Sequence, residues 1–223
     1  MIHSLDTSYE QAEREMLLSL AHSGDVLFDV GAYVGWYSVD FAQKVPGSKV
    51  YAFEPISEAR AELNKNLGGL KNVFIYAFGL SDKTEFVDFH VSESEHGTAS
   101  MAPLEEDRFG PTTKVKKLVT TIDEQCSAYH PPPNIIKIDV EGAELLVLKG
   151  GQNIIERHRP IIQCEMLRKW SKRFNYHPND IIALLGGMGY QCFTLRDGKL
   201  SQFETMTEDT VETNFFFLPR SQS

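Results

Sequence analysis

Short apolar runs alternate with helical segments through the first 77 residues of the chain. Three runs, at 26–30, 49–53 and 73–77, each have the length of one buried strand. Helical patterns at 36–44 and 57–67 separate them. Nearly continuous apolar strands joined by helices are typical of a parallel sheet covered on both faces. Right-handed crossovers then build a Rossmann-like unit, so the pattern predicts an α/β fold.

The rest of the chain extends this pattern, and one domain is expected over residues 1–223. An N-terminal helix is expected within residues 1–24, and the polar segment 92–113 is predicted to be a lid or an acceptor-binding loop. Further strands, including a late antiparallel one, are expected at 85–91, 114–119, 134–140, 160–166, 190–195 and 214–218. Further helices are expected at 143–157, with a break at 150–151, and at 178–188.

Charge and composition exclude several classes of protein. The 22 basic and 31 acidic side chains among 223 residues give a net charge of −9, which disfavours nucleic acid as a partner. No apolar run approaches the roughly 18 residues of a membrane-spanning helix, and no signal-peptide pattern opens the chain. Cys126, Cys164 and Cys192 form no CxxC motif, which fits reduced thiols and a cytoplasmic location.

The strongest local motif is DVGAYVG at 29–35, between the first strand and its helix. Gly31 permits a sharp turn with room for a ligand, and Gly35 permits close contact between helix and strand. Glu54 ends the second strand nineteen positions after Gly35, near the spacing at which an acid meets ribose hydroxyls. These residues predict a pocket for an adenosine-bearing cofactor at the carboxyl ends of the parallel strands.

The glycine spacing indicates which cofactor the pocket takes. Pyrophosphate cofactors favour G-x-G-x-x-G, whose middle glycine lets the backbone reach the phosphates. This chain has G-x-x-x-G, with the bulky Tyr33 inside the turn and Asp29 just before it. A carboxylate repels a pyrophosphate but suits the ammonium and sulfonium charges of S-adenosylmethionine. The motif therefore favours S-adenosylmethionine over NAD or FAD.

The motifs resemble the FkbM-type family of S-adenosylmethionine-dependent methyltransferases. The resemblance runs over about residues 26–166, and IKIDVEGAE is its most specific block. The matching segments are FDVGAYVGWYS (28–38), FEP (53–55), GLSD (79–82), TTIDE (120–124), IIKIDVEGAELLVLKGG (135–151) and PIIQCEM (160–166). The resemblance implies a class I methyltransferase fold, and commonly O-methylation of a hydroxyl on a sugar, a glycan or a small natural product.

The resemblance also implies a set of cofactor-binding residues. In it, the glycine turn surrounds the methionine part, Glu54 holds the ribose diol, and Asp139 approaches the sulfonium or the amino group. The adenine is expected beside the GLSD segment. The implied residues are Asp29, Gly31, Tyr33, Gly35, Glu54, Pro55, Ser81, Asp82, Asp139 and Glu141.

Methylation of an alcohol also needs a group that accepts the hydroxyl proton. The candidate bases are Glu165, Asp139 and His96, in that order. Asp139, Glu141 and Glu165 are expected to converge on one rim, where their oxygens suit Mg²⁺. The pattern works equally well without a metal ion, and no metal site is predicted.

Two other functions remain open on the same architecture. One is a nucleotide-dependent oxidoreductase, although Tyr33 occupies the place of the middle glycine. The other is a catalytically silent module that binds S-adenosylmethionine. The acceptor is expected to be a small molecule or a glycan. Neither its identity nor the oligomeric state follows from the residues.

Overall fold

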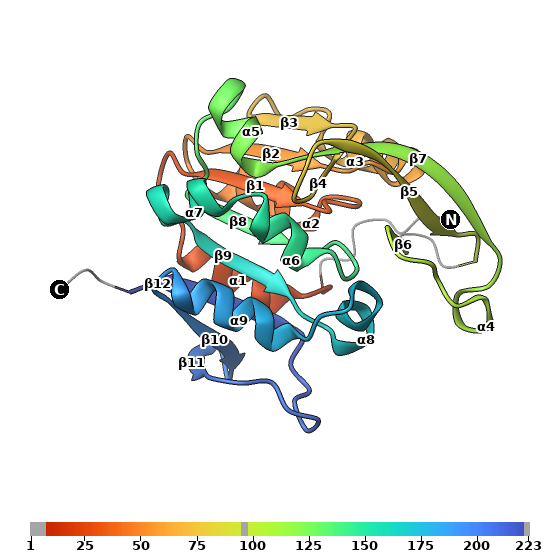
Figure 1. Cartoon of the computed structure of the whole chain (residues 1–223). Coiled ribbons are helices and arrows are strands. Elements are labelled where there is room, and N and C mark those ends of the chain that lie inside the picture. Colours follow the sequence, from red (N-terminus) through yellow and green to blue (C-terminus); the bar gives the residue numbers. More distant parts are fainter. Residues whose placement is uncertain (1–7, 95–97, 221–223) are drawn as a thin grey trace.

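The computed structural model describes residues 8–94 and 98–220 and is built around an eight-stranded sheet (Figure 1). The strand order is β11-β10-β12-β9-β8-β1-β2-β3. Five neighbouring strands are parallel: β9 (Ile161–Glu165), β8 (Ile135–Ile138), β1 (Val26–Val30), β2 (Lys49–Phe53) and β3 (Val73–Tyr76). The remaining three are antiparallel: β12 (Asn214–Pro219), β10 (Tyr190–Arg196) and β11 (Lys199–Phe203). The predicted α/β fold with a late antiparallel strand is therefore confirmed.

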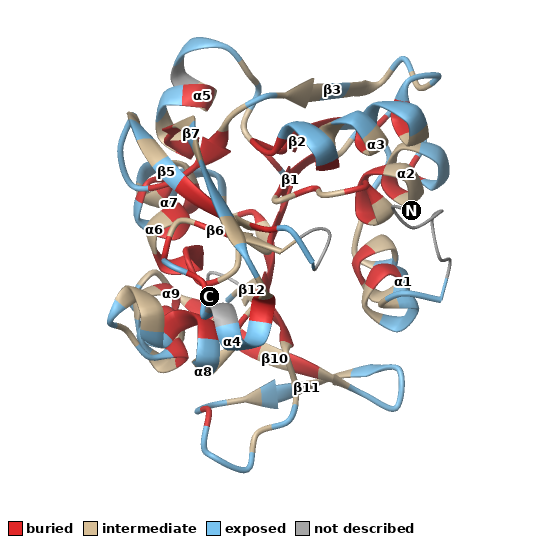
Figure 2. Cartoon of the chain, turned by 90° about the vertical axis from the view of Figure 1, so that its right-hand side faces the viewer, coloured by how far each residue is buried: buried red, intermediate tan, exposed pale blue. Residues whose placement is uncertain are grey.

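Helices cover both faces of this sheet because its central strands are apolar on both sides. Phe28 packs into the core under one face, whereas its neighbour Leu27 packs under the other. Figure 2 shows the two helical layers on either side of the buried strands. One layer holds α1 (Gln11–Ser19), α2 (Trp36–Lys44) and α3 (Ser57–Leu67). The other holds α5 (Ile122–Ala128), α6 (Glu144–Lys149), α7 (Gln152–His158) and α9 (Pro178–Gly187).

A second sheet is inserted between β3 and α5. Its strand order is β4-β7-β5-β6, and β5 pairs with β7 over eight residues from Glu85 to Ser92. The strands are β4 (Gly79–Leu80), β5 (Glu85–Ser92), β6 (Ala99–Ser100) and β7 (Thr112–Thr120). The segment 92–113, predicted as a lid, contains β6 and the short helix α4 (Glu106–Phe109). The long pair of strands β5 and β7 projects beyond the main sheet (Figure 1).

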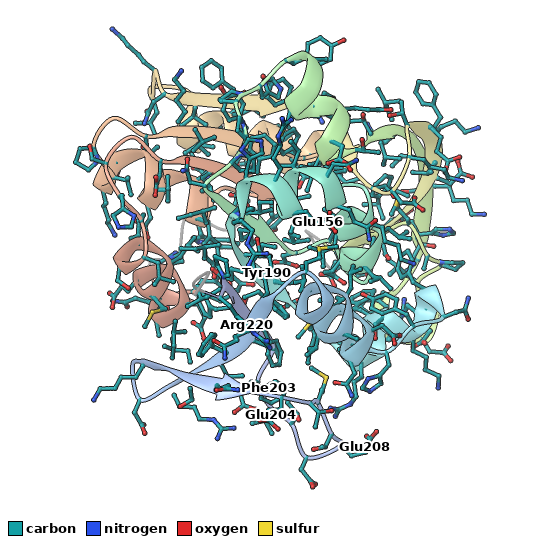
Figure 3. All side chains as sticks on the ribbon, turned by 60° about the vertical axis from the view of Figure 1, so that its left-hand side comes forward. Glu156, Tyr190, Phe203, Glu204, Glu208 and Arg220 are labelled. Atoms are coloured by element: carbon teal, nitrogen blue, oxygen red, sulfur yellow. The ribbon has the colours of Figure 1, made fainter. Side chains whose placement is uncertain are left out.

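The C-terminal part of the chain completes the antiparallel edge of the main sheet. After β9, the chain forms α8 (Arg168–Ser171) and a 3-10 turn (Lys172–Phe174), neither of which the sequence predicted. The strand β11 is also new, and it packs at the outer edge because β12 returns between β9 and β10. Figure 3 shows Phe203 at the end of β11 and Glu208 in the loop that follows, away from Glu156 on α7.

The break between α6 and α7 at Gly150 fits the sequence prediction and has a steric cause. A Cβ atom on Gly150 would overlap the backbone carbonyl oxygen of Ser81, just after β4. The carbonyl of Gly150 also accepts a hydrogen bond from the Asp123 backbone N–H at 3.0 Å. The end of α6 is therefore packed directly against the start of the inserted sheet and against α5.

We expect Gly150→Ala to destabilise the protein, because the new methyl group meets backbone that cannot rotate away. Overpacking of this kind costs about 1–3 kcal/mol of unfolding free energy, which lowers Tm by several degrees in a chain of this size. Gly69→Ala is the matched control, since a Cβ there has no neighbour within 4 Å. Thermal unfolding of both variants tests this, and equal Tm values would contradict the steric explanation.

Candidate functional site

A large cavity in the described residues lies at the carboxyl ends of the parallel strands. Its volume is about 580 Å³, within the range of small-molecule sites. The glycine turn after β1, the β2–α3 junction and the turn after β8 form its walls. Residues of β5, β6 and β7, including Phe89, Ala99 and Thr113, cover it. The inserted sheet therefore encloses the place where this fold class binds ligands.

The glycine turn is shaped by the close approach of β1 and β8. Gly31 has φ +77°, and a Cβ atom there would overlap the backbone carbonyl oxygen of Asp139. Gly35 has φ +94° and immediately precedes α2, and a Cβ there would lie 2.7 Å from the Leu63 side chain. The glycines therefore serve strand and helix packing, and Gly31 and Tyr33 also line the cavity.

Glu54 follows β2 and connects the glycine turn to the start of α3. Its carboxylate accepts hydrogen bonds from the backbone N–H groups of Tyr33 (3.0 Å) and Ile56 (2.8 Å). The side chain lines the cavity although the residue is only 6% exposed. Burial raises the pKa of this carboxyl to about 7, against the lowering effect of the two N–H donors. Pro55, the next predicted residue, also lines the cavity.

Asp29 lies beneath the glycine turn and does not line the cavity. The Ser38 hydroxyl donates a 2.6 Å hydrogen bond to its Oδ2. Its Oδ1 is buried without a hydrogen bond and lies 3.8 Å from the ammonium of Lys137. Burial raises the pKa of Asp29, while Lys137 and Ser38 lower it. This residue therefore belongs to the support of the turn.

Lys137, on β8, is the main polar residue of the site that the sequence analysis missed. It lines the cavity and is 6% exposed. Its ammonium donates to the carbonyl of Gly31 and to Oδ2 of Asp139, both at 3.3 Å. The signal was a single charged residue inside the buried strand IIKI, because a buried charge is retained only where it finds partners.

Three carboxylates lie near the ends of β8 and β9, and two of them line the cavity. Asp139 and Glu141 are lining residues, whereas Glu165 is not. Glu141 has φ +52°, and its Oε2 is buried with no hydrogen-bond partner in the described residues. Burial and then the charge of Asp139 raise the pKa values of both Glu141 and Glu165. Among the described residues, no group of three metal-ligating side chains has the geometry to hold an ion.

Two other predicted residues, Ser81 and Asp82, lie apart from the cavity walls. Ser81 and Asp82 do not line the cavity, and the Ser81 backbone N–H donates to the carbonyl of Thr120 at 2.7 Å. The Ser81 hydroxyl donates to Oδ1 of Asp82 at 3.3 Å. His96 lies outside the described residues.

An aromatic group at the cavity wall was not predicted. Tyr9, which precedes α1, stacks on Trp36 with ring centroids 4.3 Å apart. Tyr33 contacts the same indole at 5.6 Å. All three side chains line the cavity. The N-terminal segment therefore contributes Tyr9 to the site. This contribution was not predicted because Tyr9 is far in sequence from the glycine motif.

The parallel sheet with its antiparallel edge, the glycine turn and the acid after the second strand together match the class I methyltransferase fold. A solved FkbM methyltransferase from Methylobacillus flagellatus KT superposes with a TM-score of 0.57 at 18% identity, covering 89% of this chain and 44% of that one. The model of the methyltransferase FkbM domain matches residues 29–192. The chain belongs to the FkbM methyltransferase family.

Two curated relatives align with about two thirds of the chain. The hexuronic acid methyltransferase AglP of Haloferax volcanii is 31% identical over 152 residues, 68% of this chain and 60% of the relative. The 2-O-methyltransferase NoeI of Sinorhizobium fredii is 26% identical over 166 residues, 69% of this chain and 68% of the relative. The match thus spans about three fifths to two thirds of these relatives. Within residues 8–94 and 98–220, no helix has the length and apolar character needed to cross a membrane.

The buried carboxyl of Glu54 predicts a pH dependence of stability. Its pKa is about 7 in the folded state against an ordinary 4.5, so between these pH values the folded protein holds the proton that the unfolded chain releases. Stability from this group is therefore lost as pH rises from 4.5 to 7, by an amount on the order of 3 kcal/mol. We expect Glu54→Gln to flatten the change of unfolding free energy over this window.

Denaturant titrations at several pH values measure this slope. Glu58→Gln, at an exposed position in the first turn of α3, controls for the loss of one carboxylate. If the wild type and Glu54→Gln lose the same stability between pH 4.5 and 7, the buried acid is not responsible.

Proposed function

We propose that the chain binds S-adenosylmethionine in the cavity and transfers its methyl group to the oxygen of a hydroxyl acceptor. The observation that carries the proposal is Glu54, a buried carboxylate that lines the cavity beside the glycine turn. Both of its oxygens already accept from backbone N–H groups, which fixes their orientation, and each oxygen retains a lone pair for a ribose hydroxyl.

The cavity walls suit the other parts of the same molecule. We place the methionine part against Gly31 and Tyr33 and the ribose on Glu54. Pro55 and Ile56 line the cavity next to Glu54, and we therefore place the adenine against them rather than against Ser81. The acidic lining around Asp139 and Glu141 fits a ligand that carries sulfonium and ammonium charges.

The chemistry requires alignment and a proton acceptor. S-adenosylmethionine supplies a methyl group on a positively charged sulfur, and the bond from that carbon to sulfur breaks as the acceptor oxygen attacks. The protein holds the oxygen in line with that bond, which accounts for much of the rate. Of the candidate bases, Glu165 does not line the cavity, whereas Asp139 does. Glu141 also lines it and has a buried, unpaired oxygen, so we infer that Glu141 accepts the hydroxyl proton.

The relatives and the residues of the inserted sheet that cover the cavity support one class of acceptor. The names of the relatives refer to hexuronic acid methylation and 2-O-methylation, which supports a sugar or a related polyhydroxyl compound for this chain. Glu93 and Thr98, both from the predicted lid segment, line the cavity and offer polar groups to such a molecule. We propose no nucleic-acid partner, in keeping with the net charge of −9.

Calorimetry with S-adenosylhomocysteine, the demethylated product, tests the cofactor. We expect the wild type to bind it, and Glu54→Ala and Gly31→Val to lose most of that affinity. Thermal unfolding shows whether each variant is folded, and Ser81→Ala serves as a control outside the cavity. A wild type that binds NAD(P) in a fluorescence titration and ignores S-adenosylhomocysteine would make the chain an oxidoreductase. Cofactor binding without turnover on a panel of sugar acceptors would indicate a silent module.

The paired variants Glu141→Gln and Glu165→Gln identify the base. We expect Glu141→Gln to lower kcat by about 10²–10⁴-fold, the usual contribution of general base catalysis, while the Kd for S-adenosylhomocysteine changes little. Glu165→Gln should have a smaller effect, because its carboxylate does not line the cavity. Labelled-methyl transfer gives kcat, and a greater loss in Glu165→Gln would transfer the role to that residue.

A further inference from the structure

The charges that line the cavity are strongly unequal. Among the described residues, its acidic lining residues are Glu54, Glu58, Glu93, Asp139 and Glu141. Lys137 is the single lysine or arginine of that lining. A ligand that bears a carboxylate would be repelled by most of this surface and has one basic side chain available to it.

Lys137 has the geometry of a binding group and not only of a buried counter-ion. An ammonium has three protons to donate, and two of them are directed at the Gly31 carbonyl and at Asp139. Its third neighbour, Oδ1 of Asp29, is 3.8 Å away, beyond hydrogen-bond distance. One proton is therefore left for a ligand in the cavity. Burial lowers the pKa of Lys137, but Asp139 and Asp29 outweigh burial, so the pKa is raised and the group stays charged.

The surroundings of Lys137 favour an anion at this point of the cavity. The ammonium lies 5.2 Å from the ring of Tyr37, the second residue of α2, and Trp36 and Tyr37 both line the cavity. The first backbone N–H groups of a helix have no partner within the helix, and its dipole is positive there. The ammonium of Lys137 contacts the glycine turn at Gly31, and the positive end of α2 follows the same turn after Gly35, so both border it.

We propose that Lys137 binds the α-carboxylate in the methionine part of S-adenosylmethionine, with Asp139 next to it receiving the α-ammonium. This inference rests on the proposed cofactor. The zwitterionic end of the ligand then lies against a neighbouring ammonium and carboxylate, whose charged atoms are 3.3 Å apart. Each charged group of the ligand then lies beside a protein group of opposite charge. The acidic lining alone could not pair with the carboxylate of the ligand.

The competing explanation is that Lys137 only neutralises Asp29 and Asp139. Calorimetry distinguishes the two roles with S-adenosylhomocysteine and with its analogue in which hydrogen replaces the α-carboxylate. We expect the wild type to bind the carboxylate-bearing ligand about 10- to 100-fold more tightly, the range for hydrogen bonds to charged groups. Equal affinity of the wild type for the two ligands would overturn the proposal while leaving the proposed function intact. Failure of both to bind would instead remove the proposed function.

Two variants locate the effect. Lys137→Met should reduce the preference for the carboxylate to less than about threefold. The double variant Asp29→Asn with Lys137→Met removes one charge of each sign, keeps the local net charge and should show the same loss while protecting the fold. Lys137→Arg should retain a preference. If a folded variant without Lys137 keeps the wild-type preference, another group binds the carboxylate and the proposal is wrong.

Discussion

The ammonium of Lys137 joins the two strand ends on which the site is built. It contacts the glycine turn after β1 through the carbonyl of Gly31, and it contacts Asp139, the residue that follows β8. A buried charge is stable only with partners, so these contacts hold both turns in one arrangement. Because Gly31 has no side chain, the turn approaches the Asp139 carbonyl closely enough for the ammonium to reach both. The floor of the cavity therefore depends on a charge and a glycine together.

Glu54 illustrates how the same fold holds a functional group in an unfavourable environment. Burial raises its pKa to about 7, which means that the ionised form is destabilised near neutral pH. The backbone N–H groups of Tyr33 and Ile56 partly offset this cost by donating hydrogen bonds to the carboxylate. Tyr33 lies in the glycine turn after β1, and Ile56 lies just after Glu54 itself. A ribose diol would add two donors to the same carboxylate. The binding of such a ligand and the ionisation of Glu54 would therefore favour each other.

Local periodicity predicted the architecture because the information was local. The apolar run that became β1 and the glycine turn after it are contiguous in sequence, and the position of Glu54 followed from strand length. The inserted sheet was harder to predict, since β5 and β7 pair across the segment that was predicted as a lid. The strand β11 is a local partner of β10, and the Asp197-Gly198 dipeptide between them was the signal for this hairpin. Lys137 was missed for a related reason. A lysine in an apolar strand indicates a buried charge, but its partner Asp29 becomes its neighbour only when β1 pairs with β8.

The inserted sheet that covers the cavity and the turn after β8 are coupled, although they come from different parts of the chain. The Ser100 hydroxyl, in β6, donates to the backbone carbonyl of Glu141 at 2.9 Å. Farther out, Arg173 donates to the carbonyl of Pro103, and the rings of Phe109 and Trp170 pack 5.4 Å apart. The inserted segment is thus fastened at two points to the elements that follow β8 and β9. The first of these points is the backbone carbonyl of Glu141. One hydrogen bond therefore links a movement of β6, which covers the cavity, to a movement of the Glu141 carboxylate.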